Sequence, residues 1–268
     1  MQVSCIIPTK NRSRMVIQAI DSALEQQGEC PEVVVVDDGS SDSTVALVKE
    51  TFPSVKVVEI SGLGPGPARN AGVEAAAGDI LMFLDSDDLW FPHHVESLCR
   101  ILDQGYPVAY GVTRTINEVN GGEFTTPEEH ACSEGDCFNH LLRWCFLVPS
   151  AVAVKRETFS SINGFGSEPY GEDWFFFLKL AARFPFGFAA GAPITLRRLH
   201  KGSLCCLTGN SKILQLVRGL INFLKDEPRV EFKDLAHFMR LEQFVMQRGN
   251  DWLTVQDWYL AMQEEGII

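Results

Sequence analysis

The sequence predicts an α/β fold, in which a mostly parallel β-sheet carries helices on both faces and a helical appendage follows. Two observations predict it. Over the first two hundred residues, short apolar runs alternate with amphipathic segments, the order from which parallel sheets are built. From Ser211 on, apolar residues recur only at helical spacing. We therefore expect one domain over residues 1–208 and a helical extension packed on it over residues 209–268.

The elements are predicted from the spacing of apolar residues. Runs of buried character predict strands, and apolar residues on one face of a 3.6-residue period predict helices. Strands are expected over 3–7, 33–36, 55–60, 80–84, 108–112 and 151–154, with extended segments over 186–190 and 194–196. Helices are expected over 15–24, 45–52, 67–77, 92–102, 138–146, 174–184, 213–224, 235–245 and from 254, with Pro92 in a first helical turn, and a hairpin over 117–134.

Composition limits the class of partner. The chain has 268 residues, 46% of them apolar, and 35 acidic against 23 basic side chains, a formal charge of −12. This balance argues against nucleic acid and anionic membranes, which favour clustered Lys and Arg. Apolar runs stay shorter than the roughly 18 residues of a membrane span, and the N-terminus enters a strand with no leader pattern. We expect a cytoplasmic protein without a membrane span.

The eight cysteines do not predict a disulfide framework. Cys5, Cys99 and Cys145 lie in apolar patterns typical of buried thiols. A zinc site is one interpretation of the segment that contains His130, Cys132, Cys137 and His140. Its spacing matches no common structural zinc pattern, which favours a loop in which these residues fall together by chance.

Polar clusters follow three predicted strands, at Pro8 to Arg12, Asp37–Asp38 and Asp85 to Asp88. Because ligands of parallel sheets bind at the carboxyl ends of the strands, the three clusters predict one site. Carboxylates crowded after a buried strand repel one another, and a divalent cation would offset that repulsion. The alternative is a solvated turn in which Asp87 or Asp88 caps the next helix.

Seven short motifs over about residues 2–205 resemble those of glycosyltransferase family 2. They are Ile7-Pro8-Thr9-x-Asn11-Arg12, Val36-Asp37-Asp38-Gly39-Ser40-x-Asp42, Gly66-x-Ala68-Arg69-Asn70-x-Gly72, Leu84-Asp85-Ser86-Asp87-Asp88, Gly164-Phe165, Gly171-Glu172-Asp173 and Arg198-x-His200. The resemblance implies the Rossmann-like GT-A fold and transfer of a sugar from a nucleotide diphosphate sugar, most readily UDP-linked, to a hydroxyl. One base without a second carboxylate nucleophile suggests direct displacement with inversion. The Gln-x-x-Arg-Trp signature of processive synthases is missing, which favours single-sugar transfer.

The resemblance also implies roles for the motif residues. Contacts to the nucleotide donor are expected from Pro8, Thr9, Asn11, Arg12, Asp37, Asp38, Arg69, Asp85, Ser86, Asp88 and Arg198. Asp87, with Asp85 and His200, is expected to bind Mg²⁺ or Mn²⁺. Asp173 is expected to be the general base and Glu172 to orient it or bind the acceptor.

Each role has a structural alternative. Asp37–Asp38 suit a turn with Gly39, followed by a helix capped by Ser40 or Ser41. Arg69 suits a helix surface, and Glu172–Asp173 suit a first helical turn. A lone histidine such as His200 is often structural.

Other functions are weaker interpretations. A sugar-nucleotide nucleotidyltransferase would carry a Gly-rich first loop, and a dinucleotide oxidoreductase a Gly-x-Gly-x-x-Gly turn; the first loop here is Pro8-Thr9-Lys10-Asn11-Arg12. A degenerate module that binds a nucleotide sugar without turnover stays open. The acceptor is expected to be a glycan, a lipid-linked molecule or a small molecule, and a second copy of the chain is a candidate partner.

Overall fold

The computed structural model describes residues 2–127, 134–168, 170–203 and 210–247. The chain divides into two compact units. The first comprises Met1–Ile116, Gly122–Ser167 and Glu172–Arg198, and the second Asn117–Gly121, Glu168–Gly171 and Leu199–Ile268. Among the predicted site residues, His200 alone belongs to the second unit.

A seven-stranded sheet forms the centre of the first unit, in the order β10-β6-β9-β4-β1-β2-β3. Its strands are β1 (Val3–Thr9), β2 (Glu32–Asp37), β3 (Lys56–Glu59), β4 (Ile80–Phe83), β6 (Val108–Gly111), β9 (Val152–Lys155) and β10 (Phe186–Ala189). The pairs β1–β2, β1–β4, β2–β3 and β6–β10 are parallel. β9 runs antiparallel to both neighbours. The prediction of a mostly parallel sheet is confirmed.

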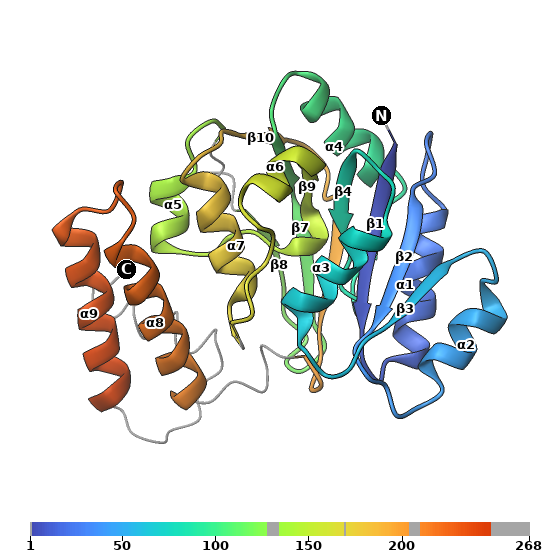
Figure 1. Ribbon diagram of the computed structural model, residues 1–268, viewed down its shortest axis with the longest axis horizontal. Coiled ribbons are helices and arrows are strands. Elements are labelled where there is room, and N and C mark those ends of the chain that lie inside the picture. Colours follow the sequence, from blue (N-terminus) through green and yellow to red (C-terminus); the bar gives the residue numbers. More distant parts are fainter. Residues whose placement is uncertain (1, 128–133, 169, 204–209, 248–268) are drawn as a thin grey trace. The chain divides into compact units, whose positions relative to one another are not determined.

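Helices cover both faces of this sheet (Figure 1). The helices are α1 (Ser13–Leu24), α2 (Thr44–Thr51), α3 (Pro65–Ala75), α4 (His94–Asp103), α5 (Phe138–Arg143), α6 (Arg156–Ser161) and α7 (Glu172–Ala181). On one face, Ile20 of α1 and Leu98 of α4 share a buried cluster with Met82 of β4. On the other, Phe83 packs edge-on against Phe176 of α7, 6.1 Å between ring centroids.

A smaller sheet, in the order β5-β11-β7-β8, was not predicted as a unit. It contains β5 (Leu89–Trp90), β7 (Thr113–Asn117), β8 (Glu123–Thr126) and β11 (Thr195–Leu199). The β7–β8 pair is a hairpin, but it begins at Thr113 and ends at Thr126, earlier than the expected range of 117–134. β5 is only two residues long, too short for a periodic signal. β5 pairs antiparallel with β11, with Leu89 opposite Leu196. This pairing places β11, at the end of the first unit, next to the turn formed by Asp85 to Asp88, called the acidic turn below.

Several element boundaries differ from the prediction by a few residues, and three of these differences involve prolines. β1 does not stop at Pro8 but continues to Thr9, with Pro8 opposite Val36. Pro92 is not in a first helical turn, because α4 begins at His94 with His93 as its N-cap. Helix α3 begins at Pro65, two residues early, since proline is favoured at that position.

In the second unit, α8 (Asn210–Lys225) and α9 (Phe232–Gln247) pack against each other. Both were predicted. The helix expected from residue 254 lies outside the described residues, as do His130, Cys132, Cys205 and Cys206. Among the helices that the structure describes, none combines the length and the hydropathy that crossing a bilayer requires.

Candidate active site

The predicted polar clusters meet at one edge of the large sheet. β1, β2 and β4 are parallel neighbours, so Thr9, Asp37 and the residues after Phe83 lie at the same carboxyl ends. A Cβ on Gly72 of α3 would lie 2.3 Å from Ile6 Cγ2. This glycine therefore lets α3 approach β1 closely and brings Arg69 to the edge.

Arg69 is the buried cation of the site. Its side chain is 4% exposed, with Nη2 2.6 Å from Asp85 Oδ1 and Nη1 2.8 Å from Glu172 Oε1. The guanidinium also lies 5.0 Å from the Phe165 ring centroid. The alternative of a helix-surface arginine is wrong. Burial alone would lower the pKa of Arg69, but the two carboxylates outweigh burial and raise it. The ion pairs join the end of β4 to the start of α7.

Glu172 and Asp173 lie in the first turn of α7. Burial and the charge of Asp173 raise the pKa of Glu172 to about 7, against the opposing effect of Arg69. Burial also raises the pKa of Asp173, whose side chain is half-buried. Its Oδ1 accepts a hydrogen bond of 2.8 Å from the Trp174 backbone N–H. A carboxylate with a raised pKa is a better proton acceptor near neutrality.

Two arginines contact Asp87. Arg12 Nη1 lies 2.8 Å from Asp87 Oδ2. Arg198, on β11, donates from Nε to the Asp87 carbonyl oxygen, and its Nη1 lies 2.5 Å from Gln18 Oε1. Gln18 was not found from the sequence, because a single glutamine on an amphipathic helix carries no motif.

Asp88 points into the protein, and its residue is 3% exposed. Oδ2 accepts a 2.6 Å hydrogen bond from Ser150 Oγ, and Oδ1 accepts one of 3.1 Å from the Arg198 backbone N–H. Burial, with the charges of Asp87 and Asp85, raises the pKa of Asp88. The alternative that Asp87 or Asp88 caps the next helix is wrong, since His93 is the N-cap. Ser86 is also buried, 4% exposed.

Both carboxylate oxygens of Asp38 accept hydrogen bonds from the loop that follows β3. Oδ1 accepts from the Leu63 N–H at 2.7 Å and Oδ2 from the Gly64 N–H at 3.0 Å. Lys10 Nζ lies 4.0 Å from Oδ2. A carboxylate offers about four lone-pair positions, so capacity for a further N–H donor is left.

The other residues of this end form a turn. Asp37 Oδ2 accepts from the Ser40 N–H at 2.8 Å, which confirms the turn but not the cap, because Ser43 caps α2. Asn11, at φ 52°, accepts at Oδ1 from the Ser41 N–H at 2.7 Å. In the part of the chain that is described, Thr9 Oγ1 and Asp37 Oδ1 are buried without a hydrogen-bond partner.

The site residues fit a divalent cation of the Mg²⁺ or Mn²⁺ type. Such ions take hard oxygen ligands, keep several waters and need one or two protein carboxylates. Asp85 and Asp87 have side chains 30% and 17% exposed. Across the described ranges, no group of three or more His, Cys, Asp and Glu side chains is arranged to hold a metal by itself.

His200 belongs to the second unit and is described there. The ring Nδ1 of His200 accepts a 3.1 Å hydrogen bond from the Gly202 backbone N–H, and the backbone N–H of His200 donates to Ser203 Oγ at 3.0 Å. The histidine is thus tied into a local turn. Of the segment considered for zinc, Cys137 is buried beside α5 and His140 is exposed.

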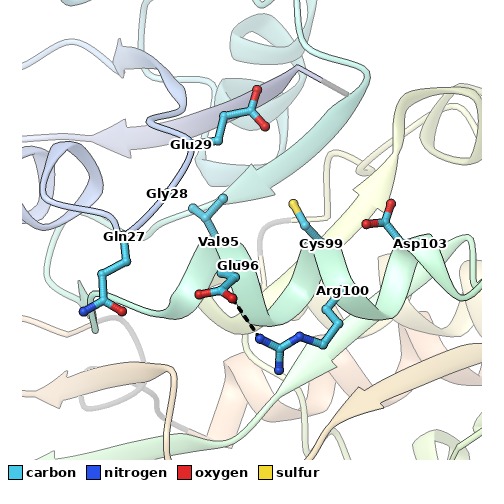
Figure 2. A pocket seen from close by; sticks show the side chains of 8 residues that line it. All are labelled: Gln27, Gly28, Glu29, Val95, Glu96, Cys99, Arg100 and Asp103. Carbon is cyan, nitrogen blue, oxygen red and sulfur yellow. Dashed lines mark hydrogen bonds and ion pairs between the residues drawn. The ribbon is translucent and has the colours of Figure 1, made fainter.

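A hollow of about 340 Å³ lies elsewhere, between Gln27–Glu29 and α4. Figure 2 shows Cys99 and Asp103 along one side of it, and the 2.9 Å ion pair of Glu96 with Arg100. Residues 27–29 precede β2, at the amino end of the strand. The hollow therefore lies at the opposite end of β2 from Asp37 and Asp38.

The mostly parallel sheet, the acidic residues after β4 and the carboxylate pair that opens α7 are the features expected from the resemblance to the GT-A class of proteins. The model of glycosyl transferase family 2 matches residues 4–159, more than half of the chain, and the chain belongs to this family. An uncharacterized glycosyltransferase of Nostoc sp. (strain PCC 7120) is 31% identical over 175 residues, covering 60% of this chain and 53% of that protein. The chain thus spans about half the length of that relative.

Solved structures share the fold. Staphylococcus aureus TarS (residues 1–349), in complex with UDP-GlcNAc, superposes with a TM-score of 0.72 at 19% identity, over 93% of this chain and 74% of that one. A mannosyltransferase of Pyrobaculum calidifontis, in complex with GDP-Man and Mn²⁺, superposes with a TM-score of 0.59 at 19% identity, over 91% and 69%. The predicted GT-A fold is confirmed.

Proposed function

We propose that the protein transfers a single sugar from a nucleotide diphosphate sugar, with UDP as the favoured nucleotide, to an acceptor hydroxyl. One observation carries the proposal: Arg69 binds both Asp85, after β4, and Glu172, beside Asp173. The acidic turn and the candidate base are therefore held at one edge of the sheet. A transferase needs the leaving diphosphate and the acceptor hydroxyl to be side by side.

Asp173 is the proposed general base. Its raised pKa supports proton abstraction from a hydroxyl near neutrality. Glu172, fixed by Arg69 at 2.8 Å, orients the first turn of α7. With one base and no second carboxylate nucleophile, the acceptor oxygen attacks the anomeric carbon directly, the diphosphate leaves, and the configuration inverts.

The donor is proposed to lie along β1, β2 and β4. Asp38 accepts the N–H of the uracil ring, beside Pro8, Thr9, Asn11 and Asp37. Arg12 and Arg198, with Ser86 of the acidic turn, lie near the diphosphate, and Arg69 acts on it through Asp85.

Asp87 and Asp85 are proposed to hold Mg²⁺ or Mn²⁺. When bound, the ion offsets the charge that develops on the leaving diphosphate. Arg12, which contacts Asp87, lies where it can add to that charge compensation.

A thermal-shift screen of nucleotide sugars, each with and without Mn²⁺, identifies the donor, because a ligand that binds the folded state raises its apparent stability. The donor is then tested for hydrolysis and transfer with wild type and Asp173→Asn. Loss of transfer with retained donor binding in the variant supports the proposal. Donor binding without turnover for any acceptor in the wild type favours the degenerate binding module instead, and absence of binding by every nucleotide sugar refutes both.

A further inference from the structure

Ser150 links the acidic turn to the chain behind it. This residue lies in the short helical turn η1 (Pro149–Ala151) and is fully buried. Its Oγ donates to Asp88 Oδ2 at 2.6 Å and accepts from the Asp85 N–H at 3.1 Å. One hydroxyl therefore holds the first and the last carboxylate residue of the Asp85–Asp88 turn.

The carbonyl oxygen of Ser150 holds a second set of elements. It accepts from Trp90 Nε1, on β5, at 2.8 Å and from Thr195 Oγ1, on β11, at 2.9 Å. β11 also carries Arg198, whose backbone N–H donates to the other oxygen of Asp88. The turn, η1, β5 and β11 thus meet through one buried residue.

We propose that Ser150 is a positioning residue that holds the Asp85–Asp88 turn in the arrangement that receives the nucleotide diphosphate. With both oxygens of Asp88 occupied from within the protein, this carboxylate is directed inward. Asp85 and Asp87 keep their partial exposure at the sheet edge. The effect on ligand binding rests on the proposed function, whereas the position of the turn does not.

The chain contains a matched control at the other end of β4. Ser4 is also fully buried. Its Oγ donates to Glu32 Oε2 at 2.6 Å and accepts from the Gly78 N–H at 2.8 Å. Ser4 and Ser150 therefore make the same pair of bonds, to a carboxylate and to a backbone N–H, before and after one strand. If Ser150 had a purely structural role, replacing Ser150 or Ser4 with alanine would affect nucleotide binding to a similar extent.

The experiment compares Ser150→Ala and Ser4→Ala with wild type. Calorimetry measures binding of UDP with Mn²⁺, and hydrogen–deuterium exchange follows the amides of Asp85, Arg198 and Gly78. Loss of a residue that orients metal-site ligands commonly weakens binding about 10- to 100-fold. We expect that loss in Ser150→Ala, with faster exchange at Asp85 and Arg198. Ser4→Ala is expected to retain wild-type affinity and to exchange faster at Gly78.

Equal losses of affinity in the two variants overturn the proposal, as does wild-type affinity in Ser150→Ala. If wild type does not bind UDP with Mn²⁺, the proposed donor is wrong, and hydrogen–deuterium exchange alone tests the positioning role. Unchanged exchange at Asp85 and Arg198 in Ser150→Ala overturns that role. Faster exchange at these two amides in Ser150→Ala, but not in Ser4→Ala, supports it. If Ser150→Ala does not fold, Trp90→Phe is used instead, because it removes the indole donor to the Ser150 carbonyl oxygen. The proposal then requires weaker UDP–Mn²⁺ binding and faster exchange at Asp85 and Arg198, both changes being smaller than those expected for Ser150→Ala.

Discussion

Replacing Arg69 with methionine tests whether a buried cation holds the site together. Arg69→Met keeps much of the apolar volume and removes the guanidinium that lies 2.6 Å from Asp85 and 2.8 Å from Glu172. The Glu172 side chain is 11% exposed, so its charge would stay buried without a partner. Removal of one partner of a buried ion pair costs about 3–5 kcal/mol. Because the pKa of Glu172 is about 7, the unpaired carboxyl can take up a proton instead of staying charged, so at pH 8 we expect the free energy of unfolding to fall by only about 1.4 kcal/mol. Nearly all of this loss comes from Glu172, because the Asp85 side chain is 30% exposed.

The loss should depend on pH in a defined direction. Glu172 has its pKa raised from 4.5 to about 7, so between these values the folded protein binds more protons than the unfolded chain. The free energy of unfolding therefore falls as pH rises through this window. Without Arg69, which lowers this pKa, the window extends to higher pH. The gap between wild type and variant should thus be small near pH 5 and grow above pH 7, by up to about 1.4 kcal/mol per pH unit.

Urea unfolding at pH 5, 7 and 8, followed by tryptophan fluorescence, measures this gap. Arg100→Met is the matched control, because Arg100 also forms a 2.9 Å ion pair with a glutamate, but one whose side chains are 65% and 57% exposed. The control is expected to be near wild type at every pH. A gap for Arg69→Met that is equal at pH 5 and pH 8, or no larger than that of the control, would refute the reasoning.

Four further outcomes are expected. Asp173→Asn should keep donor binding and lower transfer about 10²- to 10⁴-fold, and wild-type kcat/KM should fall on its acid side at a pH above the ordinary pKa of an aspartate, because burial raises the pKa of Asp173; transfer at the wild-type rate contradicts the base. Asp87→Ala should abolish Mn²⁺-dependent UDP binding in calorimetry, with Glu96→Ala as the unaffected control. Asp38→Ala should weaken UDP about tenfold or more but leave inhibition by pyrophosphate unchanged; equal weakening of both ligands contradicts a base contact. Arg12→Met should weaken UDP binding with Mn²⁺, and unchanged affinity contradicts its diphosphate role.

Much of the fold follows from local patterns. β1, β2 and β4 are apolar runs of strand length, and the helices between them repeat apolar residues on one face. Since parallel strands align their carboxyl ends, the sequence alone predicted that Thr9, Asp37 and Asp85 would come to one edge. The boundaries were less predictable where two signals compete, as at Pro8, which continues β1 although it lacks an N–H.

The contacts within the site could not be predicted in the same way. Arg69 and Glu172 are 103 residues apart, and no periodicity links them. Sequence motifs led us to expect Arg69 in contact with the nucleotide donor, whereas its guanidinium is paired with two carboxylates. Ser150 lies 62 residues from Asp88, between the helix expected over 138–146 and the strand expected over 151–154, and no sequence motif indicated a role for it. Such contacts depend on how β9, β11 and α7 return to the sheet edge, which local patterns leave undetermined.

The crowded carboxylates of the opening motif are resolved by giving each one a different partner. Asp85 is paired with Arg69 and Asp87 with Arg12, while Asp88 is hydrogen-bonded inward to Ser150 and Arg198. The repulsion that suggested a cation at the sequence level is therefore offset within the chain itself. A divalent ion at Asp87 would compete with Arg12 for the same carboxylate, and a diphosphate would supply Arg12 with a new anionic partner. Ion binding at Asp87 would release Arg12 for the diphosphate, and diphosphate binding to Arg12 would release Asp87 for the ion. Ion and nucleotide should therefore favour each other's binding.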